Sequence, residues 1–335
     1  MKQIKLLDVT LRDGGYTNDW EWGNEDIDAI LSALKQSKVD VIELGFLRDN
    51  AKNDKNSVLF NSIHEANKLL EKHTINNAAM MLDHALVNID NIPDYNDTTG
   101  QVKILRVMVR QSNIKGGLEY SQQLIDKGYE VYIQPTIISG YTTAEFVDLV
   151  QQVNNLKGIT AFYIVDTFGA MYRTDLLLKF NIANDILDND ITIGWHSHNN
   201  LQLSYSLTSS LFTDTTNVSG RTLIIDASIF GIGRGAGNLN IEIIVGALNA
   251  MKDRYHVTPL FSVVNIIKKY NFGYDVPFYI TAKLNLHPSY GLYIRDNYPD
   301  MLESTMYKIM KGIPKEEKNK YNQLLIEKLI EERLT

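Results

Sequence analysis

The sequence predicts a (β/α)8 TIM barrel followed by a small, mainly helical C-terminal extension, and three observations indicate this fold class. Short apolar segments rich in β-branched residues alternate with stretches of helical period, as in parallel α/β proteins. The length of 335 residues suits a barrel of about 250 residues with an additional piece. Charged residues, histidines and glycines follow several apolar segments, where barrel enzymes have their active sites. A doubly wound open sheet would show the same local alternation, so periodicity alone leaves the closure of the sheet open.

Eight repeats of a strand and a helix can be counted along the chain. The expected strands lie near residues 4–9, 39–46, 77–82, 102–109, 129–134, 160–165, 191–196 and 222–229. The expected helices include residues 25–38, 57–71, 118–127, 144–155, 174–187, 201–212 and 241–252. We expect Asn24 and Thr143 to cap two of them, because a short polar side chain before a helix accepts a hydrogen bond from a free amide of the first turn.

The character of the sequence changes near residue 256, where aromatic and proline-bearing segments begin. Residues 315–335 are dense in charge but keep apolar residues at helical spacing. We therefore expect a catalytic barrel domain over residues 1–255 and a helical extension over residues 256–335.

Composition and charge restrict the classes of partner. The net charge of -7 argues against general affinity for nucleic acid or for an anionic membrane, since both need a basic surface. The N-terminus has no apolar run of signal-peptide length, so we expect a soluble, cytoplasmic protein without a membrane partner. The chain has no cysteine, so any metal must bind to oxygen and to imidazole nitrogen.

A charged segment, Asp8 to Tyr16, directly follows the first expected strand and reads Asp-Val-Thr-Leu-Arg-Asp-Gly-Gly-Tyr. It places Arg12 and Asp13 at the catalytic face of a barrel. The alternative is a charged turn in which Arg12 pairs with Asp13 and the glycines supply positive φ.

A histidine pair, His196 and His198, ends the seventh expected strand. Side chains two positions apart on a strand point to the same face, so both imidazoles can reach one metal ion. Two imidazoles with a carboxylate suit manganese, iron, cobalt or zinc, whereas magnesium prefers more oxygen ligands. The alternative is a pair of structural histidines near a strand end.

A glycine-rich segment, Gly231 to Asn238, follows the eighth expected strand and reads Gly-Ile-Gly-Arg-Gly-Ala-Gly-Asn. Its glycines would let backbone amides approach an anion at a helix N-terminus, and Arg234 within it is a candidate substrate-binding residue. A dinucleotide site is disfavoured, because that fingerprint follows the first strand of its βαβ unit. A tight turn from strand to helix is the remaining alternative.

Buried polar residues stand at two other strand ends. Glu43 is a candidate catalytic residue, and Asp166 and Thr167 are candidates for substrate binding, because a carboxylate in an apolar strand is costly unless it is paired or functional. Arg106 could neutralise one of these carboxylates inside the barrel or bind substrate. Structural ion pairs would account equally well for these charges.

Together, four motifs resemble the family of metal-dependent barrel lyases and synthases that includes 4-hydroxy-2-oxovalerate aldolase, hydroxymethylglutaryl-CoA lyase, isopropylmalate synthase and homocitrate synthase. The motifs are Thr-Leu-Arg-Asp-Gly, Ile-Glu-Leu-Gly, His-Ser-His-Asn and Gly-Ile-Gly-Arg-Gly-Ala-Gly-Asn, and the resemblance covers about residues 4–252. It implies that Asp13, His196 and His198 bind a divalent metal, with Asn238 as a further ligand. It also implies that Arg12 stabilises an enolate.

Within this family the first motif is most similar to the oxo-acid aldolases, whereas the acyl-CoA synthases commonly continue with Glu-Gln after the glycine. Tyr16 stands where the aldolases usually have a histidine base. A free phenol with a pKa near 10 is a poor base at neutral pH, so a water on the metal, His287 or Tyr290 from the extension are alternatives to Tyr16 as the base.

The resemblance implies an aldolase or lyase that acts on a 2-oxo acid through a pyruvate enolate, with an aldehyde as the second reactant. Manganese is the expected metal, with magnesium, cobalt and zinc as alternatives. A Claisen-type acyltransferase that uses acetyl-CoA and a non-catalytic metal-binding barrel are the competing functions. The sequence is also compatible with a homo-oligomer.

Overall fold

The fold is a closed parallel barrel. A computed structural model describes residues 3–52, 54–96, 101–213 and 220–334. One strand, β1 (Ile4–Asp8), pairs in parallel with both β9 (Leu223–Ala227) and β2 (Val41–Leu47), which closes the ring. The remaining barrel strands are β4 (Ala78–Asp83), β5 (Ile104–Val109), β6 (Glu130–Pro135), β7 (Ala161–Asp166) and β8 (Thr192–Ser197). All eight expected strands are confirmed, with ends that differ by a few residues.

A ninth strand, β3 (Leu59–Phe60), lies outside the ring and pairs with β2. A helix was expected over these residues, as part of the segment 57–71. Because the chain is extended here, the following helix, α3 (Ile63–His73), begins later than expected, and the Ser62 hydroxyl accepts a hydrogen bond from the amide of Glu65.

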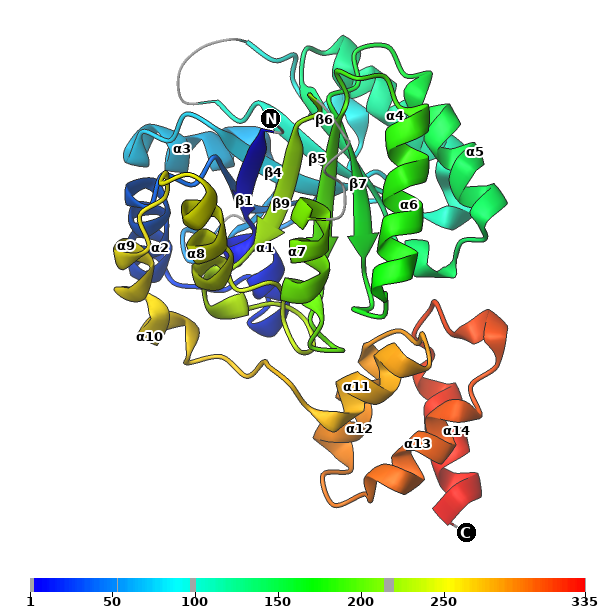
Figure 1. Cartoon of the computed structure of the whole chain (residues 1–335). Helices are drawn as coiled ribbons and strands as arrows, with labels where there is room; N and C mark the ends of the chain where they lie inside the picture. The colour runs from blue at the N-terminus through cyan, green and yellow to red at the C-terminus, as the bar shows by residue number, and fades with distance from the viewer. Residues whose placement is uncertain (1–2, 53, 97–100, 214–219, 335) are drawn as a thin grey trace.

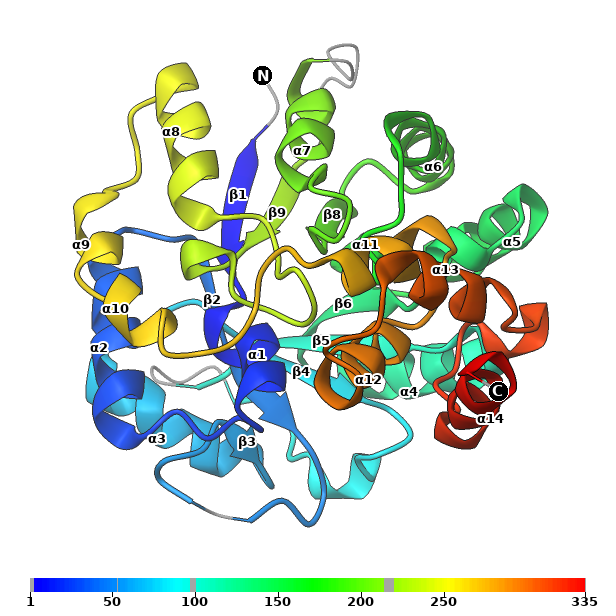
Figure 2. The same cartoon turned by 90° about the horizontal axis from the view of Figure 1, so that it is seen from below.

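Helices surround the barrel, as Figure 2 shows along the barrel axis. They are α2 (Asn24–Gln36), α3, α4 (Ile114–Asp126), α5 (Thr143–Asn154), α6 (Arg173–Ile186), α7 (Ser204–Thr213) and α8 (Ile241–Met251). Two caps differ from expectation. Asn24 is already the first residue of α2 and follows Gly23, whose φ is 87°. The cap of α5 is Thr142 rather than Thr143, and it exchanges hydrogen bonds with Glu145.

Short helices follow several strands and build the catalytic face. One of them, α1, follows β1 directly and carries the first charged motif. These short elements are α1 (Thr10–Gly14), η1 (Gly15–Thr17), η2 (Ile89–Asn91), η3 (Gln111–Asn113), η4 (Ile138–Gly140) and η5 (Ile229–Gly231).

The chain beyond α8 has two parts with different packing. Leu260 in α9 (Thr258–Phe261) and Ile267 in α10 (Val264–Ile267) belong to the core of the barrel. A separate core begins at Ile280 in the extension. The change of core falls between Phe272, which still packs against the barrel core, and Ile280. The extension consists of α11 (Val276–Lys283), α12 (Ser289–Asn297), α13 (Glu303–Lys311), η6 (Lys315–Glu317) and α14 (Gln323–Leu334).

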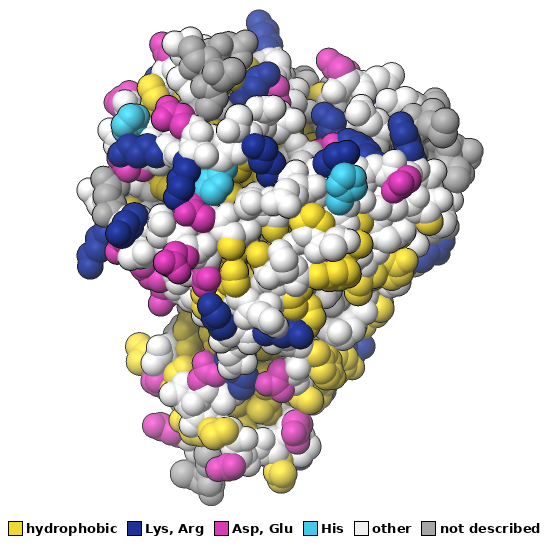
Figure 3. All heavy atoms as spheres, turned by 90° about the vertical axis from the view of Figure 1, so that its left-hand side faces the viewer, with side chains coloured by type: hydrophobic (Ala, Val, Ile, Leu, Met, Phe, Trp, Pro, Cys, Tyr) yellow, Lys and Arg dark blue, Asp and Glu magenta, His cyan; other side chains and the backbone are white. Residues whose placement is uncertain are grey.

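The extension lies beyond the carboxyl ends of the barrel strands, on the catalytic side (Figure 1). From the side, the molecule is broad at the barrel and narrower at the extension (Figure 3). The Ser139 hydroxyl in η4 donates a hydrogen bond of 2.9 Å to Asn285 Oδ1. The extension also approaches Gly140 closely, since a Cβ there would lie 3.3 Å from Asn319 Nδ2. None of the helices in the described ranges is long and apolar enough to span a membrane.

Candidate active site

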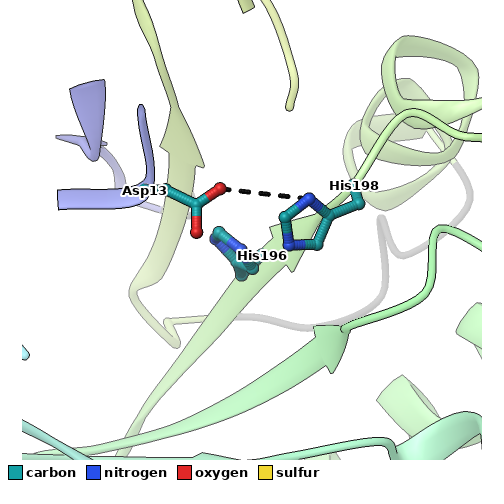
Figure 4. A group of neighbouring side chains, drawn as sticks. All are labelled: Asp13, His196 and His198. Carbon is teal, nitrogen blue, oxygen red and sulfur yellow. Dashed lines mark ion pairs between the residues drawn. The ribbon is translucent and has the colours of Figure 1, made fainter. Parts of the chain in front are cut away.

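Three buried side chains converge at the carboxyl end of the barrel. Asp13 comes from α1, His196 from β8 and His198 from the residue after β8. One ligand atom from each lies within 4.8 Å of the others, and Figure 4 shows the three side chains facing one another. This geometry confirms that the spacing of two along the strand brings both imidazoles to the carboxylate.

A second carboxylate orients the imidazole of His196. His196 Nδ1 lies 2.9 Å from Oδ2 of Asp226 on β9. Burial alone would raise the pKa of Asp226, but Arg106 and His196 hold it below its usual value. Since the ionised carboxylate only accepts hydrogen bonds, Nδ1 carries the proton, and the lone pair of Nε2 is left for a metal. Such carboxylate-histidine pairs commonly fix the tautomer of a metal ligand.

Two buried polar atoms beside these ligands lack a partner. His198 Nδ1 is 3.9 Å from Asp13 Oδ2, and Asn238 Oδ1 has no hydrogen bond in the described part of the chain. Asn238 is held in place, because its Nδ2 donates to Asp13 Oδ2 at 2.6 Å and to the carbonyl of Ile232 at 2.9 Å. Buried polar atoms normally have partners, so two orphaned atoms next to a carboxylate fit a divalent cation.

Backbone packing explains one glycine of the last motif. At Gly233 a Cβ would lie 2.3 Å from Asn238 Nδ2 and 2.6 Å from Asp13 Oδ2. Any other residue would displace the candidate ligands, so this glycine permits a close approach to the site.

Arg12 is fixed between two carboxylates. Its Nη1 donates to Asp13 Oδ1 at 2.5 Å and its Nε to Glu43 Oε2 at 2.6 Å. Burial would raise the pKa of Asp13, but Arg12 and the two histidines hold it well below its usual range. Asp13 is therefore an anion at neutral pH, as a carboxylate ligand of a metal must be. Arg12 Nη2 has no hydrogen bond to the described residues and is the guanidinium nitrogen that remains free to donate.

A cavity of about 680 Å³ opens from the ligand cluster toward the extension. Its inner wall comes from the barrel, and its outer wall includes His287 and the segment 319–321 of the extension. Of the expected site residues, the cavity is lined by Arg12, Asp13, Tyr16, Thr167, His196, His198, Arg234 and His287. The extension therefore completes the site rather than standing apart from it.

His287 and Tyr16, two of the expected bases, each carry a proton and can donate a hydrogen bond into the cavity. Burial, with the charge of Arg234, lowers the pKa of His287 to about 3, so the ring is neutral. Its Nδ1 accepts the amide N–H of Ser289 at 3.2 Å, so Nε2 carries the proton. Desolvation likewise raises the pKa of the Tyr16 phenol above its usual value, which keeps it protonated.

Tyr290 does not reach the cavity. It is fully buried, and its hydroxyl donates to the carbonyls of Glu317 and Lys320 and accepts the amide of Asn322. Tyr290 therefore holds the segment that lines the cavity. Its expected role as a base has no support in this geometry.

Three other candidates lie behind the cavity wall rather than in it. Arg106 is fully buried in an ion pair with Asp226 and lies 2.9 Å from Glu43, so it has no access to a substrate. Glu43 is equally buried and positions Arg12. Asp166 accepts the amides of Ala170 and Met171, and burial raises its pKa to about 7, so it shapes the loop after β7. The expectation of substrate contacts for Arg106 and Asp166 is corrected accordingly.

Several residues of the site were not identified from the sequence. Asp226 carried the same signal as Glu43, a carboxylate inside an apolar strand, and could have been found by it. Gln134 lines the cavity at the end of β6. Other unpredicted lining residues are polar and lie after strand ends or in the extension without a distinctive sequence pattern; they include Arg110, Gln111, Ser112, Asn319, Lys320 and Tyr321.

The fold and the site define a class of protein, a TIM barrel with a candidate divalent-metal site at the carboxyl ends of its strands. The HMGL-like family model matches residues 3–269, so the chain belongs to the HMGL-like family. Together with the names of its relatives, this membership identifies the chain as an enzyme, a lyase.

Two relatives that are equally identical to this chain are named for different reactions. The chain is 25% identical over 246 residues to the oxaloacetate decarboxylase of Mycobacterium tuberculosis, which covers 72% of this chain and 69% of that protein. It is also 25% identical over 247 residues to the 4-hydroxy-2-oxovalerate aldolase of Pelotomaculum thermopropionicum, which covers 73% and 70%.

Solved structures support the fold. The N-terminal domain of a putative aldolase from Bacteroides vulgatus superposes with a TM-score of 0.73 at 22% identity, covering 88% of this chain and 98% of that domain. The HMG-CoA lyase of Brucella melitensis gives a TM-score of 0.61 at 13% identity, covering 80% and 99%. Both similarities confirm the barrel.

Proposed function

We propose that this protein is a divalent-metal-dependent lyase that breaks, and in reverse forms, a carbon-carbon bond of a 2-oxo acid. The observation that carries the proposal is the cluster of Asp13, His196 and His198 with Arg12 beside it, at the inner end of the cavity. Arg12 distinguishes this site from a structural metal site, which needs no additional cation. The 4-hydroxy-2-oxovalerate aldolases among the relatives support an aldolase.

The candidate ligands suit several metals. Two imidazoles with one carboxylate and an amide oxygen favour manganese, cobalt or zinc over magnesium. When bound, the cation would supply a Lewis acid that polarises the 2-oxo group of the substrate. We propose manganese as the preferred metal and pyruvate as the enolate component.

Arg12 would stabilise the negative charge that develops when the bond breaks. The electron pair of the broken bond would move toward the oxo oxygen, and Arg12 Nη2 is the guanidinium nitrogen that has no hydrogen-bond partner among the described residues. Because Glu43 holds Arg12 Nε at 2.6 Å, the donor would be oriented before the reaction begins. A preorganised donor of this kind is typically worth about 10²–10³ in turnover number.

The proton donors suggest how the enolate would be quenched. Tyr16 and His287 line the cavity, and each carries a proton on the atom that has no backbone partner. Either can deliver a proton to the enolate carbon, which gives the free 2-oxo acid. Cleavage of a 4-hydroxy-2-oxo acid additionally requires that a base accept the proton of the hydroxyl group.

No cavity side chain in the described residues is arranged as a base for the hydroxyl proton, and this favours a second candidate function, decarboxylation of a 3-carboxy-2-oxo acid. In that reaction the bond to the carboxylate carbon breaks, carbon dioxide leaves, and the electron pair forms the enolate without removal of a proton. Only a proton donor for the enolate carbon is then needed, and Tyr16 and His287 are such donors. One relative is named an oxaloacetate decarboxylase.

A direct assay separates the two reactions. The protein would be stripped with a chelator, reloaded with manganese and incubated with 4-hydroxy-2-oxopentanoate or with oxaloacetate. The rate of pyruvate release would be measured. We expect pyruvate from one of the two above the rate with manganese alone, and only that background rate from His198→Ala. Release from both substrates at the background rate by the loaded protein would contradict the proposal.

A further inference from the structure

Arg234 occupies a defined position at the cavity wall. It belongs to the loop between β9 and α8, where the amide of Ala236 donates to Asn200 Oδ1 at 2.8 Å and the amide of Gly237 to the carbonyl of Arg234 at 3.2 Å. The side chain crosses to the loop after β7, and its Nη2 lies 3.4 Å from the carbonyl of Thr167. Its guanidinium carbon lies 5.4 Å from the centre of the Tyr16 ring.

The charge of Arg234 is not neutralised by the protein. The other arginines in the cavity wall or directly behind it have carboxylate partners: Arg12 has Asp13 and Glu43, Arg106 has Glu43 and Asp226, and Arg110 has Asp83. Arg234 has no ion pair within the described residues, and its buried Nε has no hydrogen bond. A confined, unpaired charge is costly to maintain unless a ligand neutralises it.

The surroundings of Arg234 within the cavity offer further donors. Tyr16 is a protonated phenol, and His287 is neutral with its proton on Nε2. Lys320 lies farther out on the exposed segment that closes the cavity, and no ion pair of Lys320 is found in the part of the chain that the structure describes. Cations and neutral donors without a carboxylate acceptor form a site that attracts an anion.

The cavity has more room than a simple 2-oxo acid needs. Its 680 Å³ falls in the range of sites that hold ligands of drug size. A 2-oxo acid with its oxo and carboxylate groups at Asp13, His196 and His198 would leave the region near Arg234 for the rest of its chain.

We propose that Arg234 binds a second anionic group, a carboxylate or a phosphate, at the far end of the substrate. The preferred substrate is then a 2-oxo acid with two acidic ends rather than one with an apolar tail. This inference rests on the proposed function, which places the first acidic end at the metal ligands. Arg234 acts as the specificity-determining residue, and its planar fork suits either anion.

The test compares ligands that differ at one end. Binding of 2-oxopentanedioate, 2-oxopentanoate and 2-oxo-4-phosphonobutanoate to the manganese-loaded protein would be measured by calorimetry. A charge-assisted hydrogen bond at Arg234 predicts that the acidic ligands bind about 10- to 100-fold more tightly than 2-oxopentanoate. The tighter of the two acidic ligands identifies the anion as carboxylate or phosphate.

Three variants locate the effect. Arg234→Met should remove the preference and leave the affinity for 2-oxopentanoate unchanged. Arg48→Met removes the same charge from an exposed position outside the cavity and should keep the preference. Equal affinities in the wild type, a preference that survives in Arg234→Met, or a preference lost only in Lys320→Met would each overturn the inference.

A metal-free arm separates this inference from the proposed function. Inorganic phosphate should raise the melting temperature of the chelator-treated wild type, and this shift should disappear in Arg234→Met. If phosphate acts through Arg234 but no 2-oxo acid binds the loaded protein, the anion site stands and the proposed function fails. If the 2-oxo acids bind without discrimination and phosphate has no effect, the inference fails and the proposed function stands.

Discussion

Arg12→Lys tests the role of the guanidinium most sharply. Arg12 uses two nitrogens to contact carboxylates, Nε for Glu43 at 2.6 Å and Nη1 for Asp13 at 2.5 Å, and keeps Nη2 for the substrate. Lysine retains the positive charge but has a single nitrogen, which cannot hold both carboxylates and also face an enolate. The substitution therefore removes the orientation of the donor while it keeps the charge.

The size of the effect follows from these contacts. Loss of one oriented oxyanion donor lowers turnover about 10²–10³-fold, or about 2.7–4 kcal/mol. The loss of stability should be smaller, because Glu43 keeps Arg106 at 2.9 Å and is not left as an unpaired buried charge. Metal content should remain, since Asp13, His196 and His198 are unchanged.

The assay measures turnover, metal content by mass spectrometry and the melting temperature of wild type and variant. Arg110→Lys is the matched control, because Arg110 also lines the cavity but is bound to Asp83. Turnover of Arg12→Lys within a few-fold of wild type at full metal content would refute the reasoning and make Arg12 a structural partner of the two carboxylates.

Further predictions concern the ligands, the proton donors and the response to pH. His196→Ala and His198→Ala should each lose bound metal and activity, because each removes a ligand that no cysteine can replace; full occupancy in both variants would exclude the site. Tyr16→Phe or His287→Gln should slow proton delivery at equal metal content, whereas Tyr290→Phe should act by loosening the segment it holds; wild-type rates in all three would leave a water on the metal as the proton carrier. Because the folded state lowers the pKa of His287 to about 3, the unfolded chain binds the extra proton below pH 6.5, and stability is lost as the pH falls from about 6.5 toward about 3. The free energy of unfolding would be measured at pH 6.5 and at pH 5. His287 should contribute about 2 kcal/mol of the decrease between these pH values in wild type and none in His287→Gln. Equal decreases in the two proteins would contradict the low pKa of His287.

The local sequence predicted those residues of the site whose positions depend on strand geometry. His196 and His198 could be assigned because a strand directs alternate side chains to one face, and Asp13 because it follows the first strand at the carboxyl end of the barrel. The same logic located all eight barrel strands. It missed β3, because Leu59 and Phe60 form a strand only by pairing with β2, and local periodicity does not reveal such a pairing.

The partners of buried charges could be predicted from the sequence only in part. Of the two expected roles of Arg106, neutralising a carboxylate inside the barrel agrees with its ion pair with Glu43 at 2.9 Å. Its second partner, Asp226, was missed, because that pairing spans 120 positions and depends on the closed ring. The separate roles of His287 and Tyr290 likewise depend on how the extension folds back over the cavity, which their position in the sequence does not reveal.

Hydrogen exchange of pyruvate tests the central claim most directly. The protein loaded with manganese would be incubated with pyruvate in heavy water, and the methyl signal would be followed by proton NMR after removal of protein and metal. The group that delivers a proton to the enolate carbon also removes one in the reverse direction. The account therefore predicts loss of the methyl protons at a rate above that of manganese alone, and no such loss with His198→Ala or with chelator-treated protein. A methyl signal that persists as in the blank, with the site fully loaded, would contradict enolate formation at Asp13, His196, His198 and Arg12.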